Sequence, residues 1–145
     1  MNLNNLIRKN IKAMKPYSSA RDEFKDLKAD MVFLDANENP FETTLNRYPD
    51  PQQTALKELI SKQKELPINQ VLLGNGSDEV LDLIVRAFCE PNQDSILTLL
   101  PTYGMYSVLA QLNSIENIEV SLSKDFNINV DQVLKQVKPS TKLLF

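Results

Sequence analysis

The order of the expected elements constrains this chain more than any other feature. Past the opening segment, short apolar runs of strand character alternate with stretches in which apolar residues recur at helical spacing. This alternation is typical of a parallel sheet whose strands are joined by crossover helices. We expect helices at about 51–66, 77–90, 101–110 (carrying Tyr103 and Tyr106) and 130–137, and strands near 31–34, 71–73, 95–99, 118–122 and 142–145. The sequence therefore predicts an α/β fold with a mostly parallel sheet.

Charge and hydropathy exclude several functional classes. A net charge of −3 leaves no overall basic surface to neutralise a nucleic-acid backbone. The apolar runs are far shorter than the roughly 20 residues of a membrane-spanning helix. The basic residues of the first 17 positions are not followed by an apolar stretch, so no secretory signal is expected. We expect a cytoplasmic protein that binds neither nucleic acid nor membrane.

The chain contains no histidine. Ser-His-Asp and Cys-His catalysis, and any metal site that needs histidine, are therefore excluded from this stretch, and we expect no metal. The single cysteine, Cys89, cannot form an internal disulfide, and its place in a helical pattern predicts a buried, unreactive thiol.

A glycine-bearing turn at residues 72–79 joins an expected strand directly to an expected helix. The first N–H groups of a helix have no internal acceptor, and the helix dipole adds positive charge there, so a phosphate could bind without a basic side chain. Gly74 and Gly76 would permit the tight turn. The same residues also suit an ordinary helix start, in which Asn75 or Ser77 acts as the cap.

Two familiar nucleotide motifs do not fit this turn. Glu79 stands where a dinucleotide-binding fingerprint has its third glycine, and the chain has no Gly-Lys-Ser or Gly-Lys-Thr. A bound phosphate would therefore belong to another kind of ligand.

Four segments in order resemble the histidinol-phosphate aminotransferases, fold-type I enzymes that use pyridoxal 5′-phosphate. They are Leu34-Asp35-Ala36-Asn37-Glu38-Asn39-Pro40, Arg47-Tyr48-Pro49, Gly76-Ser77-Asp78-Glu79 and Pro101-Thr102-Tyr103-Gly104-Met105-Tyr106, with Lys15-Pro16-Tyr17 upstream. The resemblance covers essentially the whole chain and implies a truncated three-layer α/β sandwich. Residues 1–50 would form an N-terminal arm and a substrate-loop segment of the small domain. Residues 51–145 would begin the large cofactor-binding domain.

The resemblance assigns cofactor contacts to four residues. It implies that the backbone amides of Ser77 and Asp78 hold the cofactor phosphate, in agreement with the turn described above. Tyr103 would stack on the pyridine ring. Tyr48 would reach across a homodimer to the cofactor phosphate of the partner subunit. Without the resemblance, Tyr103 would be an ordinary core residue of an amphipathic helix, an interpretation that we keep for Tyr106.

Two further residues would face the substrate. Asn37 lies in the loop that meets substrate in related aminotransferases, and Tyr17 lies in a segment that can fold over the site. Asparagine and tyrosine in loops also serve local hydrogen bonding, and Tyr48 could be a turn residue ahead of Pro49.

The lysine that forms a Schiff base with the cofactor is expected beyond Phe145, so we assign no catalytic residue to this chain. The resemblance implies that the parent protein moves an amino group between glutamate and imidazole-acetol phosphate, giving histidinol phosphate in histidine biosynthesis. An aromatic aminotransferase or a threonine-phosphate decarboxylase would have a similar N-terminal sequence. The 145-residue chain by itself could also be a non-catalytic fragment.

Overall fold

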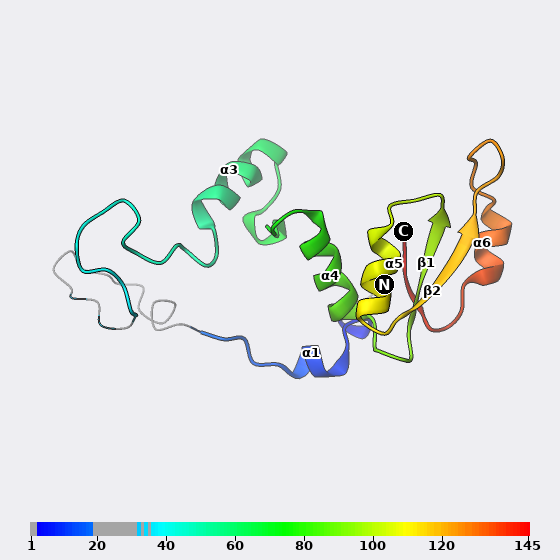
Figure 1. Cartoon of the computed structure of the whole chain (residues 1–145), viewed down its shortest axis with the longest axis horizontal. Coiled ribbons are helices and arrows are strands. Elements are labelled where there is room, and N and C mark those ends of the chain that lie inside the picture. Colours follow the sequence, from blue (N-terminus) through cyan, green and yellow to red (C-terminus); the bar gives the residue numbers. More distant parts are fainter. Residues whose placement is uncertain (1–2, 19–31, 33, 35) are drawn as a thin grey trace. The chain divides into compact units, whose positions relative to one another are not determined.

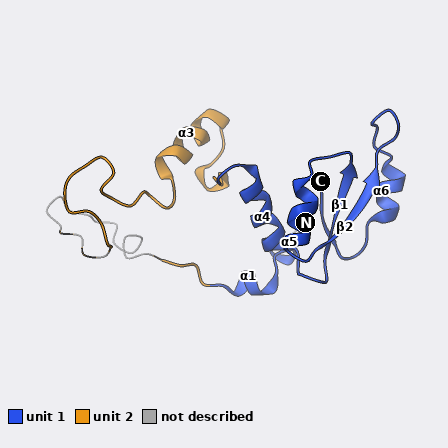
Figure 2. Cartoon of the chain, in the orientation of Figure 1, with its two compact units in different colours: residues 1–14, 74–145 blue, residues 15–73 orange. Residues whose placement is uncertain are grey.

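The computed structural model describes residues 3–18, 32, 34 and 36–145, and Figure 1 shows the order of its elements. They are η1 (Leu3–Asn5), α1 (Lys9–Ala13), α3 (Thr54–Lys64), η2 (Ile68–Gln70), α4 (Ser77–Phe88), β1 (Ser95–Leu100), α5 (Met105–Leu112), β2 (Glu116–Ser121), α6 (Val130–Gln136) and β3 (Thr141–Leu144). Contacts divide the chain into two compact units, residues 1–14 with 74–145 and residues 15–73 (Figure 2). The domain boundary expected near residue 50 stays a prediction.

The three strands form one parallel sheet in the order β2-β1-β3. β1 pairs with β2 along its whole length, from Ser95 opposite Glu116 to Leu100 opposite Ser121. Helix α5 connects β1 to β2, and α6 connects β2 to β3, so helical crossovers join the strands as parallel pairing requires. The α/β fold with a parallel sheet, expected from the sequence, is confirmed.

Helices cover both faces of this sheet, which gives three layers. Successive residues of a strand point to opposite faces. Ile96 accordingly packs with Val85 of α4 and Ala110 of α5, whereas Leu97 packs with Val133 of α6. Both strand residues are fully buried, as is usual for the central strand of a parallel sheet.

The N-terminal segment packs against the C-terminal end of α4, which the sequence did not predict. The backbone N–H of Arg8 donates to the carbonyl of Ala87 at 3.0 Å. Its guanidinium donates to both carboxylate oxygens of Glu90, at 3.0 and 3.2 Å, and to the carbonyl of Arg86 at 2.9 Å. This fork-to-fork geometry fixes the orientation of the segment.

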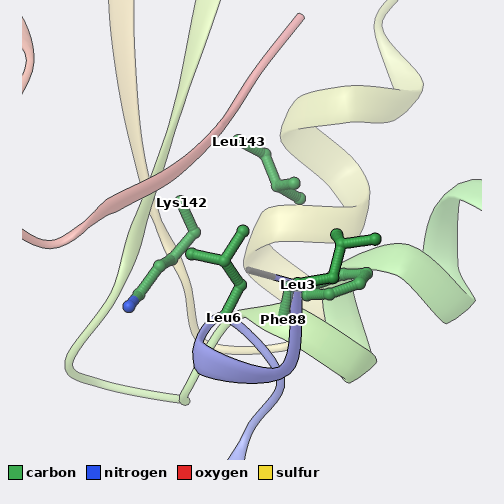
Figure 3. Close-up of a pocket in the computed structure, with 5 residues that line it drawn as sticks. All are labelled: Leu3, Leu6, Phe88, Lys142 and Leu143. Atoms are coloured by element: carbon green, nitrogen blue, oxygen red, sulfur yellow. The ribbon is translucent and has the colours of Figure 1, made fainter. Parts of the chain in front are cut away.

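An apolar pocket of about 130 Å³ lies beside this segment (Figure 3). Its walls are formed by Leu3, Leu6, Phe88, Lys142 and Leu143. Lys142 contributes its aliphatic stem, and its ammonium group points away from the other four side chains. The pocket therefore offers no polar group that would orient a ligand.

Helix α3 begins at Thr54, three residues later than expected. Asp50 accepts the N–H groups of Gln52 and Thr54, each at 2.8 Å, and Gln53 takes a left-handed conformation with φ 46°. The Thr54 hydroxyl and N–H also hold the pKa of Asp50 below its usual value. The apolar face expected on this helix is open in its own unit, since Leu56 is 52% and Leu59 is 68% exposed.

The strand expected at residues 71–73 is not formed. Val71 has extended backbone, with φ −108° and ψ 118°, but no described strand pairs with it. A strand needs a hydrogen-bonded neighbour, and local sequence does not supply one. The strand expected at Met31–Leu34 lies largely outside the described residues. None of the described helices is long and apolar enough to cross a lipid bilayer.

Candidate functional site

The turn before α4 depends on two glycines for different reasons. Gly76 has φ 80° and ψ 176°, a region that is essentially restricted to glycine. Gly74 has an ordinary φ, but a Cβ atom there would lie 2.8 Å from Cγ2 of Val80 and 3.0 Å from Oε2 of Glu79. Gly74 therefore allows close packing against Glu79 and Val80, and Gly76 provides the turn that leads into the helix.

The N-terminal end of α4 has no side-chain cap. Gly76 occupies the cap position and has no side chain, so the capping role considered for Asn75 or Ser77 is not adopted. The carboxylate of Glu79 accepts the N–H of Asn75 instead. A Cβ built on Gly76 would meet no atom within 4 Å, so the space beside Gly76 is free. The amides of Ser77 and Asp78 therefore sit where an anion can approach them.

Tyr103 lies beside this helix end. Its hydroxyl donates to both carboxylate oxygens of Asp78, at 3.1 Å each. This hydrogen bond raises the pKa of Tyr103 above its usual value, so the phenol stays protonated to higher pH. Tyr103 is 51% exposed, so this residue is available for contact with a ligand.

Tyr103 precedes α5, whereas the sequence placed it on the helix. The helix begins at Met105, with Gly104 at its cap position, and the N–H of Tyr106 donates to the carbonyl of Tyr103 at 3.3 Å. Because Tyr103 belongs to this turn, its side chain is not confined to the buried face of α5. Tyr106, by contrast, packs against the core, as expected.

An aromatic chain connects the site to the sheet. The rings of Tyr103 and Tyr106 meet edge to face, with centroids 5.8 Å apart and planes at 89°. Tyr106 in turn stacks on Phe145, with centroids 4.5 Å apart and planes at 8°. Both geometries are favourable for aromatic pairs.

In the other unit, Glu38 holds the segment that contains Tyr48. One oxygen of the Glu38 carboxylate accepts the N–H of Tyr48 at 2.7 Å, and the other pairs with the guanidinium of Arg47 at 3.0 Å. The side chain of Glu38 is only 4% exposed. Sequence reasoning missed this residue, although its position beside Asn37 in an acidic, proline-ended loop was visible.

The structure brings together three of the six expected site residues. Ser77, Asp78 and Tyr103 meet at the start of α4. The side chains of Tyr17, Asn37 and Tyr48 are exposed, with Tyr17 at 92% and Tyr48 at 60%. These three belong to the unit of residues 15–73, and their roles stay predictions.

Metal binding and thiol chemistry are the other kinds of site to consider in the described part of the chain. Across residues 3–18, 32, 34 and 36–145, no group of three or more cysteine, aspartate or glutamate side chains could hold a metal ion. Cys89 is 1% exposed, and burial raises the pKa of its thiol to about 11. The thiol is therefore protonated and unreactive, as expected.

Comparison with known sequences gives consistent matches. A family model described as "Aminotransferase class I and II" matches residues 21–145. A histidinol-phosphate aminotransferase from Flavobacterium psychrophilum is 60% identical over 99% of this chain, and one from Christiangramia forsetii is 59% identical over the same share. A third, from Bacteroides thetaiotaomicron, is 50% identical. The chain spans about 42% of the length of the first relative and 41% of the other two.

A solved structure supports the fold alone. A putative aminotransferase from Burkholderia pseudomallei superimposes with a TM-score of 0.53 over 68% of this chain and 34% of the other, at 20% sequence identity. The three-layer arrangement of helices and parallel sheet is thus part of an aminotransferase fold.

Proposed function

Because this chain belongs to the class I and II aminotransferase family, we propose that it forms the N-terminal part of a pyridoxal-phosphate-dependent histidinol-phosphate aminotransferase. The enzyme would move an amino group between glutamate and imidazole-acetol phosphate in histidine biosynthesis. The proposal is supported by relatives of that name at 50–60% identity across nearly the whole chain. We place the enzyme in the cytoplasm.

The observation that carries the proposal is the open, uncapped start of α4. A phosphate placed there would accept hydrogen bonds from the backbone amides of Ser77 and Asp78, and the helix dipole would favour its charge. Gly76 would let the anion come close, because it has no side chain and a Cβ atom there would meet no atom within 4 Å. The described residues thus fit the phosphate of the cofactor.

Tyr103 would contribute contact with the cofactor ring. Tyr103 is half-exposed and lies next to the same helix end, where its ring could orient a flat aromatic ligand and exclude water from one face. When bound, the cofactor supplies the electron sink that amino transfer needs. The residues of this chain would bind and orient it, and the lysine that bonds to it would lie beyond Phe145.

The remaining site residues would serve substrate and assembly. Asn37 and Tyr17 would face the substrate. The hydroxyl of Tyr48 would reach the cofactor phosphate of the partner subunit in a homodimer. Glu38 would then be important because it fixes the backbone at Tyr48.

Substrate profiling of the full-length enzyme tests the proposed function. Purified enzyme with pyridoxal phosphate should transfer the amino group of histidinol phosphate to 2-oxoglutarate, measured as glutamate formed. Two alternative reactions are measured in parallel. One is amino transfer from aromatic amino acids, and the other is release of carbon dioxide from threonine phosphate. Preference for either alternative over histidinol phosphate would reject the assigned substrate.

Subunit mixing tests the homodimer. A Tyr48→Phe enzyme is mixed with an enzyme in which the lysine that bonds to the cofactor is replaced. After subunit exchange, half of the sites in each heterodimer would keep both groups, so activity should partly return. If activity stays at the level of the parents after verified exchange, Tyr48 does not act across the interface.

A further inference from the structure

We propose that the carboxylate of Asp78 positions the ring of Tyr103 at the cofactor site, so that Asp78 acts through its side chain as well as its backbone amide. The inference rests on the proposed function, since that function gives the ring a ligand to face. It concerns two residues that are 25 positions apart and lie on different elements, the first turn of α4 and the loop after β1.

The hydroxyl end of the ring is held by the carboxylate. The distances from the Tyr103 hydroxyl to the two oxygens of Asp78 are both 3.1 Å, so the hydroxyl is centred on the carboxylate. The backbone of Asp78 is fixed because it belongs to a regular helix, and the first turn of a helix favours a negative charge. A charged acceptor makes this a stronger hydrogen bond than a neutral one would.

The edge of the ring is held from the sheet. Tyr103 meets Tyr106 edge to face, and Tyr106 stacks on Phe145. The N–H of Phe145 donates to the carbonyl of Leu97 at 2.9 Å, and the N–H of Leu99 donates to the carbonyl of Phe145 at 3.2 Å. The ring is therefore supported on two sides by regular elements, and Tyr103 as a residue is still about half exposed.

This arrangement predicts whether removal of the Asp78 carboxylate weakens or strengthens ligand binding. Ordering a side chain on binding reduces affinity, so a ring that is already fixed binds a flat ligand more tightly. A carboxylate without such a role would only repel the anionic phosphate nearby, and its removal would then strengthen binding. Loss of affinity after removal of Asp78 thus indicates positioning, and gain of affinity indicates simple repulsion.

The first measurement needs no cofactor. In full-length apoenzyme with ¹³C-labelled tyrosine, the Tyr103 signal is assigned with Tyr103→Phe and titrated by NMR. The hydrogen bond stabilises the neutral phenol, so its contribution is present below the ordinary pKa and is lost as pH rises through the raised one. Asp78→Ala should lower the pKa of Tyr103 toward its ordinary value. Asp78→Asn keeps an oxygen acceptor and should lower it less.

A matched control removes an acidic residue from the first turn of another helix. Asp131 stands in the first turn of α6, and α6 packs through Val133 in a different core cluster from Tyr106 and Phe145. Asp131→Ala should leave the titration of Tyr103 unchanged. An unchanged pKa of Tyr103 in Asp78→Ala would overturn the proposal, because the pair would then be absent in solution.

The second measurement is a double-mutant cycle on ligand affinity. Pyridoxamine 5′-phosphate is used because it cannot bond covalently to a lysine. Asp78→Ala should weaken its binding about two- to tenfold, because the ligand must then order the Tyr103 ring that the carboxylate no longer holds. In a Tyr103→Phe background the same change should not weaken binding, because the carboxylate no longer has a hydroxyl to hold and only repels the phosphate. Asp78→Asn should recover part of the affinity, and the induced circular dichroism of the bound ligand should follow the same order.

The outcomes separate this inference from the proposed function. If the wild-type enzyme does not bind the ligand, the proposed function fails and the positioning role fails with it. If the wild type binds, but Asp78→Ala tightens binding or has equal effects in both backgrounds, only the positioning role is wrong.

Discussion

Replacing Ser77 by proline removes one N–H from the start of α4 and should leave the helix intact. Ser77 is the first helical residue, so its N–H has no acceptor within the helix, and proline is well tolerated at that position. Proline also disfavours a helical conformation in the preceding residue, but Gly76 has ψ 176°, which is extended. The local geometry is therefore compatible with the substitution.

The expected loss of affinity follows from the type of hydrogen bond. A hydrogen bond from an amide to a charged group contributes about 1.5–3 kcal/mol. At about 1.4 kcal/mol for each factor of ten, Ser77→Pro should weaken binding of pyridoxamine 5′-phosphate roughly tenfold to a hundredfold. Ser77→Ala keeps the N–H and should have only a small effect.

Two controls make this assay specific. Pyridoxamine without the phosphate should bind Ser77→Pro and wild-type enzyme equally well. Val130→Pro places proline at the first residue of α6, and its affinity should match that of the wild type. Circular dichroism reports whether each variant is folded. Equal, small effects of alanine and proline at Ser77 would show that the phosphate does not bind at this helix end.

The same geometry predicts three effects on stability and reactivity. Gly76→Ala should lower the free energy of unfolding by about 1–3 kcal/mol, because a residue with a side chain is strained at φ 80° and ψ 176°. An unchanged free energy of unfolding in urea denaturation would contradict this strain. Glu38→Ala should cost about 1.5–3 kcal/mol in the same assay, because Arg47 and the N–H of Tyr48 lose an acceptor, whereas Glu38→Gln, which keeps an oxygen, should cost less. The Cys89 thiol, with its pKa raised to about 11, should react with a thiol reagent at pH 8 only after unfolding in urea, and fast labelling of the native protein would contradict its burial.

The regular elements of the sheet unit were predictable because their signals are local. The apolar run at residues 95–100 and the helical spacing from Val80 to Phe88 each indicate one type of element. The glycine turn before α4 was predictable for the same reason, since its residues are adjacent in the sequence. These features specify both the parallel sheet and the start of α4.

The features that were missed depend on contacts between residues that are far apart in the sequence. Arg8 and Glu90 are 82 positions apart, and Asp78 and Tyr103 are 25 apart, so no local pattern reveals either pair. The expected strand at residues 71–73 had the right composition but no pairing partner. The start of α5 was misplaced because Tyr103 fits a helical spacing that the turn at Gly104 interrupts.

A crystal structure of the full-length enzyme with pyridoxal phosphate tests the central claim most directly. The measured quantities are the distances from the cofactor phosphate oxygens to the backbone nitrogens of Ser77 and Asp78. Both should be hydrogen-bond distances, about 2.7–3.2 Å, with the ring of Tyr103 lying against the cofactor. A phosphate bound elsewhere, with these two amides hydrogen-bonded to water or to protein groups, would contradict the account.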